Sequence, residues 1–512
     1  MQQNFKRILI VGGGTAGWMT AAAFARMLKG GGFQIDLIES DDIGTIGVGE
    51  ATIPPIVDYN RTMGIDEVEF IRATQASFKL AIEFVDWTRL GHSYIHPFGA
   101  YGVPMQNVYF HHFWLRHRAQ GGKLSHDAFN SSTVGARAGR FARPMAGDRS
   151  PLPPLGYAYH FDAGLYAAYL RKLAEADGVR RIEGKVVEVK QRGEDGYIES
   201  VTLGDGRVVA ADFFIDCSGF RGLLIEQTLH AGYEDWTEWL PCDRALAVPC
   251  ERVAATTPYT RSTAREAGWQ WRIPLQHRTG NGYVYCSEFI SDDEATSLLL
   301  SRLDGAARAT PRPLRFVAGR RKECWKKNCV AVGLSSGFLE PLESTSIHLI
   351  QTAIAKLLFL LPRDRIDQSV IDKYNAMLRT ELEEIRDFLV LHYTATERND
   401  TPFWRHCQAI RKPDSLLQKW EMYQRSAVIV SPPGELFRES SWFAVFTGQG
   451  VIPDSWHPSA DIPTSDELER RLQLISGDVR KRVDAFPTHD EYIRQNCAAP
   501  PIAVKPMMER AM

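Results

Sequence analysis

Residues 7–17 read RILIVGGGTAG, and this stretch decides the fold. The apolar run at 7–11 is typical of a parallel strand that is buried on both faces. Gly12, Gly14 and Gly17 follow directly. Such glycines allow a tight turn and the close approach of a pyrophosphate to a helix N-terminus. A plain strand–turn–helix would need only one glycine, so the three together favour a dinucleotide site.

The chain beyond these glycines supports the same fold. Residues 18–29, WMTAAAFARMLK, are compatible with a helix, and residues 33–39, FQIDLIE, predict a second apolar strand. That strand ends in Glu39, about twenty residues after the glycines, where an acid that binds a ribose hydroxyl is expected. Strand, glycines, helix, strand and acid therefore follow the order of a dinucleotide-binding α/β fold.

Later segments favour a flavin over a nicotinamide. Residues 213–219, FFIDCSG, and 329–337, CVAVGLSSG, predict further apolar strands that end in small residues, and 338–346, FLEPLESTS, follows. Such strand ends along a long chain resemble the FAD-binding module of the flavoprotein monooxygenase superfamily. No second G-x-G-x-x-G follows a strand. We therefore expect no NAD(P)H domain, and electrons would come from a separate protein.

Another predicted strand carries two tryptophans. Residues 268–276 read GWQWRIPLQ. Trp269 and Trp271 are two residues apart, so on a strand both side chains point the same way. Pro274 ends regular pairing because it lacks a backbone donor. For an isolated W-x-W, core packing is the ordinary explanation.

The motif W-x-W-x-I-P, here Trp269, Trp271, Ile273 and Pro274, resembles a hallmark of flavin-dependent halogenases. The chain resembles the tryptophan-halogenase branch of that family over nearly its whole length. The other segments that carry the resemblance are GGGTAGW at 12–18, GVGEATIP at 47–54, SFKLAIEF at 77–84, HPFG at 96–99, DCSGFRGLL at 216–224, FLEPLEST at 338–345 and DTPFW at 400–404.

The resemblance implies a chemistry divided between two sites. FADH2 from a separate reductase would react with O2, and hypohalous acid would form from chloride or bromide at the flavin. The acid would then cross an internal tunnel to an aromatic substrate. Trp269, Trp271, Ile273 and Pro274 would form a partition between the two sites. The resemblance also implies the FAD-binding residues, which are Gly12, Gly14, Thr15, Ala16, Gly17, Glu39, Gly49, Ala51, Val186, Leu334 and Ile347.

Lys79 is the residue expected to deliver the halogen. It lies in SFKLAIEFVDW at 77–87, which we expect to be a helix with apolar residues around the lysine. A lone lysine in such a place could instead extend its ammonium to solvent along its methylene stem. The resemblance implies that a buried Lys79 holds hypohalous acid by a hydrogen bond or forms a haloamine.

Glu343 is the second residue expected to be catalytic. It could polarise the oxidant or take the ring proton as a positioned base. It could also be an ordinary acid at a helix N-terminus, where the helix dipole favours negative charge. Glu340 is the competing acid, and we choose Glu343 because it matches the family residue that precedes Ser-Thr.

Residues 344–361, STSIHLIQTAIAKLLFLL, predict a helix with Ser or Thr at its start. Free backbone N–H groups at Thr345 and Ser346 would make an anion site for halide or for the anionic edge of reduced flavin. The family usually has glycine at the position of Ser346, so this chain departs from the pattern there.

Substrate contacts follow from the resemblance as well. His96 and Phe98 match positions that sandwich the substrate ring, although ordinary loop packing would also explain them. Trp442 is the third expected contact. Tryptophan halogenases carry a strap with a Tyr-Tyr pair that binds the amino-acid group of the substrate. The matching interval here, 423–450, is shorter and has no Tyr-Tyr pair.

Pro432, Pro433 and Gly434 predict a turn where that strap would be. Glu435, Phe437 and Trp442 are the only stand-ins for its binding residues. We therefore expect the substrate to be an indole that lacks the amino-acid group, or a bulkier indole-type compound.

Composition limits the partners. Lys plus Arg number 60 and Asp plus Glu 62, a net charge of −2, which argues against binding to nucleic acid or anionic membrane. The longest apolar run, 357–361, is too short to cross a bilayer. Eight cysteines without a CxxC pair and the absence of a secretory signal indicate a cytoplasmic protein. We expect no metal, and the chain could form a homodimer.

We expect the fold class to be α/β, with an FAD-binding module of the flavoprotein monooxygenase superfamily and a mainly helical C-terminal substrate cap. The module would span 1–365, with 111–154 and 236–311 contributing to the substrate side. The cap would span 366–512, where 388–400 and 466–486 predict helices with polar faces.

Two other functions remain open from the sequence. A two-component flavin hydroxylase on the same fold would insert oxygen, but the tryptophan partition and Lys79 argue against it. A non-catalytic flavin-binding sensor is the second, and the presence of Lys79 together with Glu343 argues against that.

Overall fold

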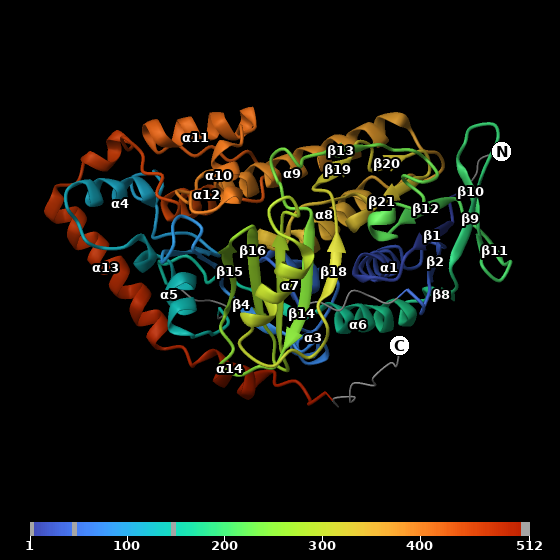
Figure 1. The fold of residues 1–512 in the computed structure, drawn as a ribbon, viewed down its shortest axis with the longest axis horizontal. Helices are drawn as coiled ribbons and strands as arrows, with labels where there is room; N and C mark the ends of the chain where they lie inside the picture. Colours follow the sequence, from blue (N-terminus) through green and yellow to red (C-terminus); the bar gives the residue numbers. More distant parts are fainter. Residues whose placement is uncertain (1–4, 44–48, 145–149, 503–512) are drawn as a thin grey trace.

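The computed structural model describes residues 5–43, 49–144 and 150–502 (Figure 1). Gly47 and Val48 of the segment 47–54 lie outside the described residues. So do 145–149 within the segment 111–154 and 503–512 at the end of the expected cap.

A six-stranded sheet carries the glycine loop, with the strand order β20-β21-β12-β1-β2-β8. Its strands from β21 to β8 are parallel, and β20 is an antiparallel edge. The predicted strands at 7–11, 33–39, 213–219 and 329–337 are confirmed and are neighbours in this sheet. The strands are β1 (Arg7–Val11), β2 (Gln34–Glu39), β8 (Arg180–Glu183), β12 (Phe213–Asp216), β20 (Trp325–Lys326) and β21 (Cys329–Ala331).

The central strand β1 explains the unbroken apolar run. It pairs with β12 on one side and β2 on the other, and Ile8–Val11 are all buried. A strand with helices on the faces of its sheet has no solvated side and so needs no polar alternation. The helix after the glycines, α1 (Thr15–Met27), packs against α6 (Ala163–Ala176) and α8 (Ser346–Phe359).

A seven-stranded sheet, β18-β14-β17-β16-β15-β5-β6, lies beside the first and carries the two tryptophans on β16. Gly282 of β17 pairs with Trp271, and a Cβ there would meet the indole at 2.0 Å. The predicted strand end at Pro274 is confirmed. The strands are β5 (Ala81–Val85), β6 (Ser93–Pro97), β14 (Arg244–Cys250), β15 (Tyr259–Arg265), β16 (Gly268–Pro274), β17 (Thr279–Tyr285) and β18 (Arg312–Arg315).

The helix predicted over 77–87 is wrong. Ser77–Lys79 form strand β4, and the chain continues as β5. Apolar residues stand at every second position, 78, 80, 82 and 84, which is the period of a strand rather than of a helix. β4 pairs with β7 (Ala158–Asp162), which also pairs with β3 (Gly49–Ala51).

Two further three-stranded sheets complete the strands. One has the order β11-β10-β9 and the other β13-β19-β22. Their strands are β9 (Val186–Gln191), β10 (Ile198–Leu203), β11 (Val208–Ala210), β13 (Tyr233–Asp235), β19 (Gly319–Arg321) and β22 (Gly337–Phe338).

The C-terminal part is helical, as expected. The long helix α9 (Gln368–Thr394) ends before 400, and every residue from Arg386 to Thr394 is buried, so the polar face predicted for 388–400 is wrong. The helix predicted over 466–486 is α13 (Ser465–Asp484), which starts with a capping box between Thr464 and Glu467. The boundary at 365 falls in the coil before α9, and the division into two domains stays a prediction.

The remaining helices lie around these sheets. Figure 1 shows the six-stranded sheet at the right, the seven-stranded sheet at the centre, and α4, α5 and α13 at the left. The remaining helices are α2 (Pro55–Thr62), α3 (Glu67–Thr74), α4 (Phe110–Ala119), α5 (Ser131–Ala138), α7 (Asp292–Ser301), α10 (Pro402–Ala409), α11 (Asp414–Ser426), α12 (Glu439–Gly448) and α14 (His489–Asn496).

Candidate active site

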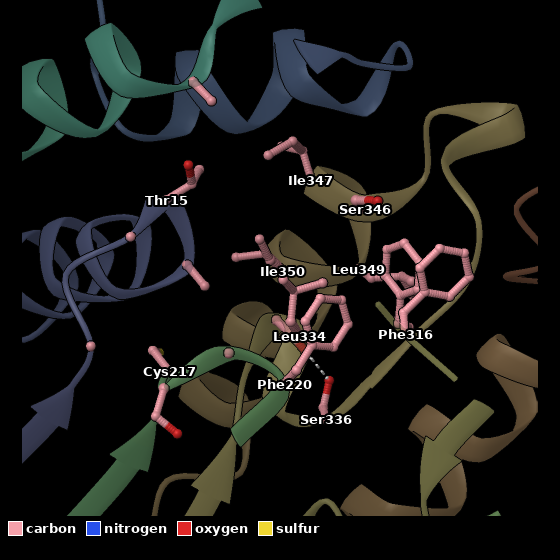
Figure 2. A pocket seen from close by; sticks show the side chains of 18 of the residues that line it. Thr15, Cys217, Phe220, Phe316, Leu334, Ser336, Ser346, Ile347, Leu349 and Ile350 are labelled. Atoms are coloured by element: carbon pink, nitrogen blue, oxygen red, sulfur yellow. Dashed lines mark hydrogen bonds between the residues drawn. The ribbon is translucent and has the colours of Figure 1, made fainter. Parts of the chain in front are cut away.

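A cavity of about 690 Å³ runs from the glycine loop to the two tryptophans. Figure 2 shows Thr15 at the start of α1 facing it, with Ser346 and Ile347 at the start of α8. Every residue expected to bind FAD lines this cavity except Gly17. Those that do are Gly12, Gly14, Thr15, Ala16, Glu39, Gly49, Ala51, Val186, Leu334 and Ile347.

The glycine loop fits a pyrophosphate. Gly12 has φ +116°, and a Cβ there would lie 2.2 Å from the Cys217 carbonyl oxygen. A Cβ at Gly14 would meet nothing within 4 Å, so that backbone faces open space. A Cβ at Gly17 would lie 1.8 Å from the Gly12 carbonyl oxygen, so Gly17 acts through helix–strand packing instead of lining the cavity.

Glu39 lies at the predicted ribose position and is already held by two donors. Trp18 Nε1 donates to Glu39 Oε2 at 3.1 Å, and Arg181 Nε donates to Oε1 at 2.5 Å. A carboxylate has about four lone-pair sites, so this pairing leaves capacity for a ribose hydroxyl.

The two tryptophans line the other end of the cavity together with Ile273, whereas Pro274 does not line it. Trp87 lies behind Trp269, with ring centroids 6.4 Å apart, and His392 lies 6.1 Å beyond Trp87. Lys79, Glu343 and His96 are not among the residues that line the cavity. This arrangement fits the expected partition, whose role stays a prediction.

Lys79 is fully buried, so the alternative in which it extends to solvent is wrong. Its Nζ donates to the Thr52 carbonyl oxygen at 3.0 Å and to Ser344 Oγ at 2.8 Å, and it lies 5.2 Å from the Phe98 ring. Burial lowers the pKa of Lys79 to about 7, against the opposing charge of Glu343. Ser344 also lines the cofactor cavity, so one hydroxyl joins that cavity to the lysine.

Glu343 is buried between two imidazoles. It ends a short 3-10 turn, Pro341–Glu343, three residues before α8, so it is not an acid in the first turn of that helix. His96 Nδ1 lies 2.8 Å from its Oε2, and His392 Nε2 lies 2.8 Å from its Oε1. Burial acts to raise the pKa of Glu343, but His96 and then His392 outweigh it and bring that pKa to about 2.

Glu340, the competing acid, has a different setting. Trp269 Nε1 donates to its Oε2 at 2.8 Å and the Tyr393 hydroxyl donates to the same oxygen at 2.6 Å. Burial raises the pKa of Glu340 to about 7. The carboxyl therefore holds the tryptophan of the expected partition and is partly protonated at neutral pH.

The helix predicted over 344–361 is confirmed with Thr345 before its first residue, and its bounds differ at both ends. The helix runs from Ser346 to Phe359 instead of 344–361, because Ser344 has φ +60° and turns the chain before the helix begins. Thr345 is the N-cap and its side chain makes no capping hydrogen bond. Ser346 lines the cofactor cavity and Thr345 does not. Their binding of halide stays a prediction.

Aromatic residues cluster around His96. Phe388 stacks on Phe437 with centroids 3.9 Å apart, and His96 lies 5.5 Å from Phe388 and 6.1 Å from Phe437. Trp442 contacts Phe388 edge-on at 4.9 Å, and its Nε1 donates to Glu435 Oε1. Substrate contact by His96, Phe98 and Trp442 stays a prediction.

His392 and Tyr393 of α9 were missed by the sequence analysis, although each holds one of the two acids. Both lie in the apolar run FLVLHY at 388–393. A polar side chain within such a run is the available signal, because buried polar groups need partners.

The described part of the chain contains no cluster of His, Cys, Asp or Glu able to hold a metal ion. All eight cysteines are buried and free. Within the described ranges, no helix has the length and apolar character required to span a membrane.

A family model, "Tryptophan halogenase", matches residues 7–465. Tryptophan 6-halogenase SttH of Streptomyces toxytricini is 35% identical over 96% of this chain and 98% of that protein. Tryptophan 7-halogenase RebH of Lentzea aerocolonigenes is 35% identical over 97% of this chain and 99% of that protein.

Solved structures agree with this relationship. Xcc4156, a flavin-dependent halogenase from Xanthomonas campestris, is 46% identical with a TM-score of 0.95, covering 98% of this chain and 100% of that one. BrvH, a flavin-dependent halogenase from Brevundimonas sp. BAL3, is 43% identical with a TM-score of 0.93, covering 97% and 99%. The chain therefore belongs to the tryptophan halogenase family and is a flavin-dependent halogenase, an oxidoreductase that uses FADH2, O2 and a halide.

Proposed function

We propose that this halogenase forms hypohalous acid in the cofactor cavity and uses it at a second site, at Lys79 and Glu343, to halogenate an indole without an amino-acid group. The flavin would supply the reducing power for O2 and would itself be reduced by a separate flavin reductase. The balance at the second site is one ring C–H and one hypohalous acid giving one C–halogen bond and one water.

Lys79 is the proposed group that orients the oxidant. Its Nζ touches Ser344 Oγ, which lines the cofactor cavity, so the amine lies next to the origin of the oxidant. With a pKa lowered to about 7 by burial, Lys79 is present both as ammonium and as amine near neutral pH. The ammonium form donates a hydrogen bond to hypohalous acid, which directs the halogen at the ring.

Glu343 is the proposed base. A pKa near 2 keeps it ionised across the neutral range, as a group that accepts a proton must be. It takes the proton from the ring carbon after the halogen has added.

One observation carries the choice of substrate class. Glu435, the acid of the shortened strap, is buried, and its negative charge is already paired with Lys419, whose Nζ lies 2.5 Å from Oε1. Trp442 Nε1 donates to the same oxygen at 3.1 Å, and Oε2 has no hydrogen-bond partner among the described residues. Two imidazoles, of His96 and His392, contact Glu343, and the rings of Phe388 and Phe437 pack near His96. An ammonium or carboxylate buried there without a partner costs several kcal/mol per ion. A neutral indole avoids this cost.

The experiment is a competition between equal indole and tryptophan with FADH2, O2 and bromide, followed by mass spectrometry. We expect indole to have the higher kcat/KM, with attack at C3, the most electron-rich ring carbon. A gain of one oxygen would support a hydroxylase instead, and predominant bromotryptophan would contradict the substrate class. The matched control is Glu435→Gln. If Glu435 binds the ammonium of tryptophan, this variant loses tryptophan turnover and keeps indole turnover.

A further inference from the structure

His392 lies at the C-terminal end of α9, fully buried in an aromatic box. The centroid of its ring lies 4.7 Å from that of Phe84, 5.3 Å from that of Phe388 and 6.1 Å from that of Trp87. With an exposed fraction of 0%, the imidazole has no contact with solvent.

Both nitrogens of His392 lie close to oxygen atoms that can only accept. Nδ1 lies 2.8 Å from the Phe388 carbonyl oxygen, and Nε2 lies 2.8 Å from Glu343 Oε1. A carbonyl oxygen and a carboxylate can only accept, whereas a neutral imidazole has one N–H and one bare nitrogen. The contact between Nε2 and Oε1 has the distance of an ion pair without the alignment of a hydrogen bond, and among the described residues neither atom has a hydrogen-bond partner. Next to a carboxylate and away from water, the positive charge of an imidazolium is therefore what the contact favours.

We infer that His392 is a positioning residue for halogenation, which acts through Glu343: as an imidazolium it keeps that carboxylate ionised so that it can take the ring proton. The inference rests on the proposed role of Glu343 as the base. It extends that role to a residue 49 positions away in the chain, which acts on the carboxylate and not on the substrate.

The neighbouring acid supplies the comparison. Glu340 is as buried as Glu343 but is held by Trp269 and Tyr393, neither of which carries a positive charge. Burial raises its pKa to about 7. Without a neighbouring imidazolium, the pKa of Glu343 would also rise.

Other groups face Glu343 and limit the size of the effect. His96 lies on β6 and binds the second carboxylate oxygen, and Lys79 on β4 interacts electrostatically with Glu343. Burial raises the pKa of Tyr94 on β6, and the negative charge of Glu343 raises it further. His96 and Lys79 remain when His392 is removed, so the carboxylate keeps part of its stabilisation.

The test is the pH profile of indole halogenation for His392→Phe, which fills the aromatic box, and for His392→Gln, which keeps an N–H donor without the charge. We expect the acid limb of kcat/KM to move up by about one to two pH units in both variants. The variants then lose kcat/KM by about tenfold to a hundredfold at the acid end of the profile and only slightly at the alkaline end. Loss by one constant factor at every pH, or a wild-type profile in His392→Gln, would overturn the inference.

The matched control is Tyr393→Phe, the next residue on α9, which removes a hydroxyl from Glu340 and should leave the acid limb in place. An equal shift in this control would overturn the inference. Glu343→Gln separates the two levels of the account. Full activity in that variant would refute the proposed function, whereas an inactive Glu343→Gln with an unmoved His392→Phe profile refutes only the role of His392.

A second readout needs no flavin. In the protein without cofactor, spectra of 15N-labelled histidine should show protons on both ring nitrogens of His392 at the pH of fastest halogenation. The His392→Phe spectrum identifies the signal. A bare Nε2 on that residue would overturn the inference.

Discussion

Glu340 and Glu343 lie three residues apart on one turn, and neither side chain reaches solvent. Around Glu340, an indole N–H and a phenol hydroxyl donate to one oxygen, and its pKa is raised to about 7 by burial. Around Glu343, two imidazoles approach one oxygen each, and its pKa is lowered to about 2. Burial is the same in both places, so the charge of the partners decides which acid is ionised.

The comparison separates two duties within one motif. Glu340, close to neutral, fixes Trp269 at the edge of the cofactor cavity. Glu343, ionised and next to Lys79, is suited to proton transfer. Neutral donors act to lower the pKa of Glu340 without outweighing its burial, whereas the two imidazoles outweigh the burial of Glu343. The two acids are therefore not interchangeable.

The largest expected effect comes from Lys79→Ala, which removes a charged neighbour of Glu343 and leaves the hydrogen-bond partners of Glu340 in place. We expect halogenation to be lost, by a factor of at least about 10²–10⁴, while FAD binding and flavin oxidation persist because the cofactor cavity does not include Lys79. Mass spectrometry of the product and flavin fluorescence measure the two properties. Lys79→Met fills the same volume and should behave alike, whereas Lys172→Ala, at an exposed site, should change nothing. Normal product from Lys79→Ala would refute the assignment.

A smaller effect should appear in stability. The pKa of Glu340 is 4.5 in the unfolded chain and about 7 in the folded protein. Its contribution to the free energy of unfolding is therefore complete below pH 4.5 and is lost as the pH rises through 7. The loss amounts to about 3 kcal/mol at 1.36 kcal/mol per pKa unit. Glu340→Gln does not titrate, so its melting temperature relative to wild type should rise between pH 5 and pH 8.

Glu343→Gln should show the opposite trend in the same experiment. The pKa of Glu343 is lowered when folded, so its contribution is present above pH 4.5 and is lost as the pH falls through about 2. The variant should therefore be weakest relative to wild type at neutral pH and approach it in acid. If the melting temperatures of the two variants, relative to wild type, changed with pH in the same direction, the pKa values of the two acids would be shifted in the same direction, which would contradict the comparison.

The fold around the cofactor was largely predictable because its signals are local. The strand at 7–11 and the strands at 213–219 and 329–337 proved to be neighbours in one sheet, since each is a short apolar run that ends in glycine or small residues. The helix expected at 77–87 failed because the apolar residues recur with period two, which was overlooked.

The partners of the two acids could not be predicted in the same way. Glu343 meets His392 only because the C-terminal end of α9 packs against Phe84 of β5, and contacts of such sequence separation have no local signature. The lack of a Tyr-Tyr strap was visible in the sequence, but the engagement of Glu435 by Lys419 was not. Spacing located the acids, and tertiary packing determined their charges.

The most direct test compares Glu343→Gln and Glu340→Gln in one halogenation assay with indole, bromide, O2 and FADH2. The amide in Glu340→Gln can still accept from Trp269 and Tyr393, so we expect activity within about threefold of wild type, the scale of a small change in one hydrogen bond. Glu343→Gln should lose halogenation by about 10²–10⁴ with an unchanged flavin spectrum. Strong loss in Glu340→Gln with activity retained in Glu343→Gln would contradict the account.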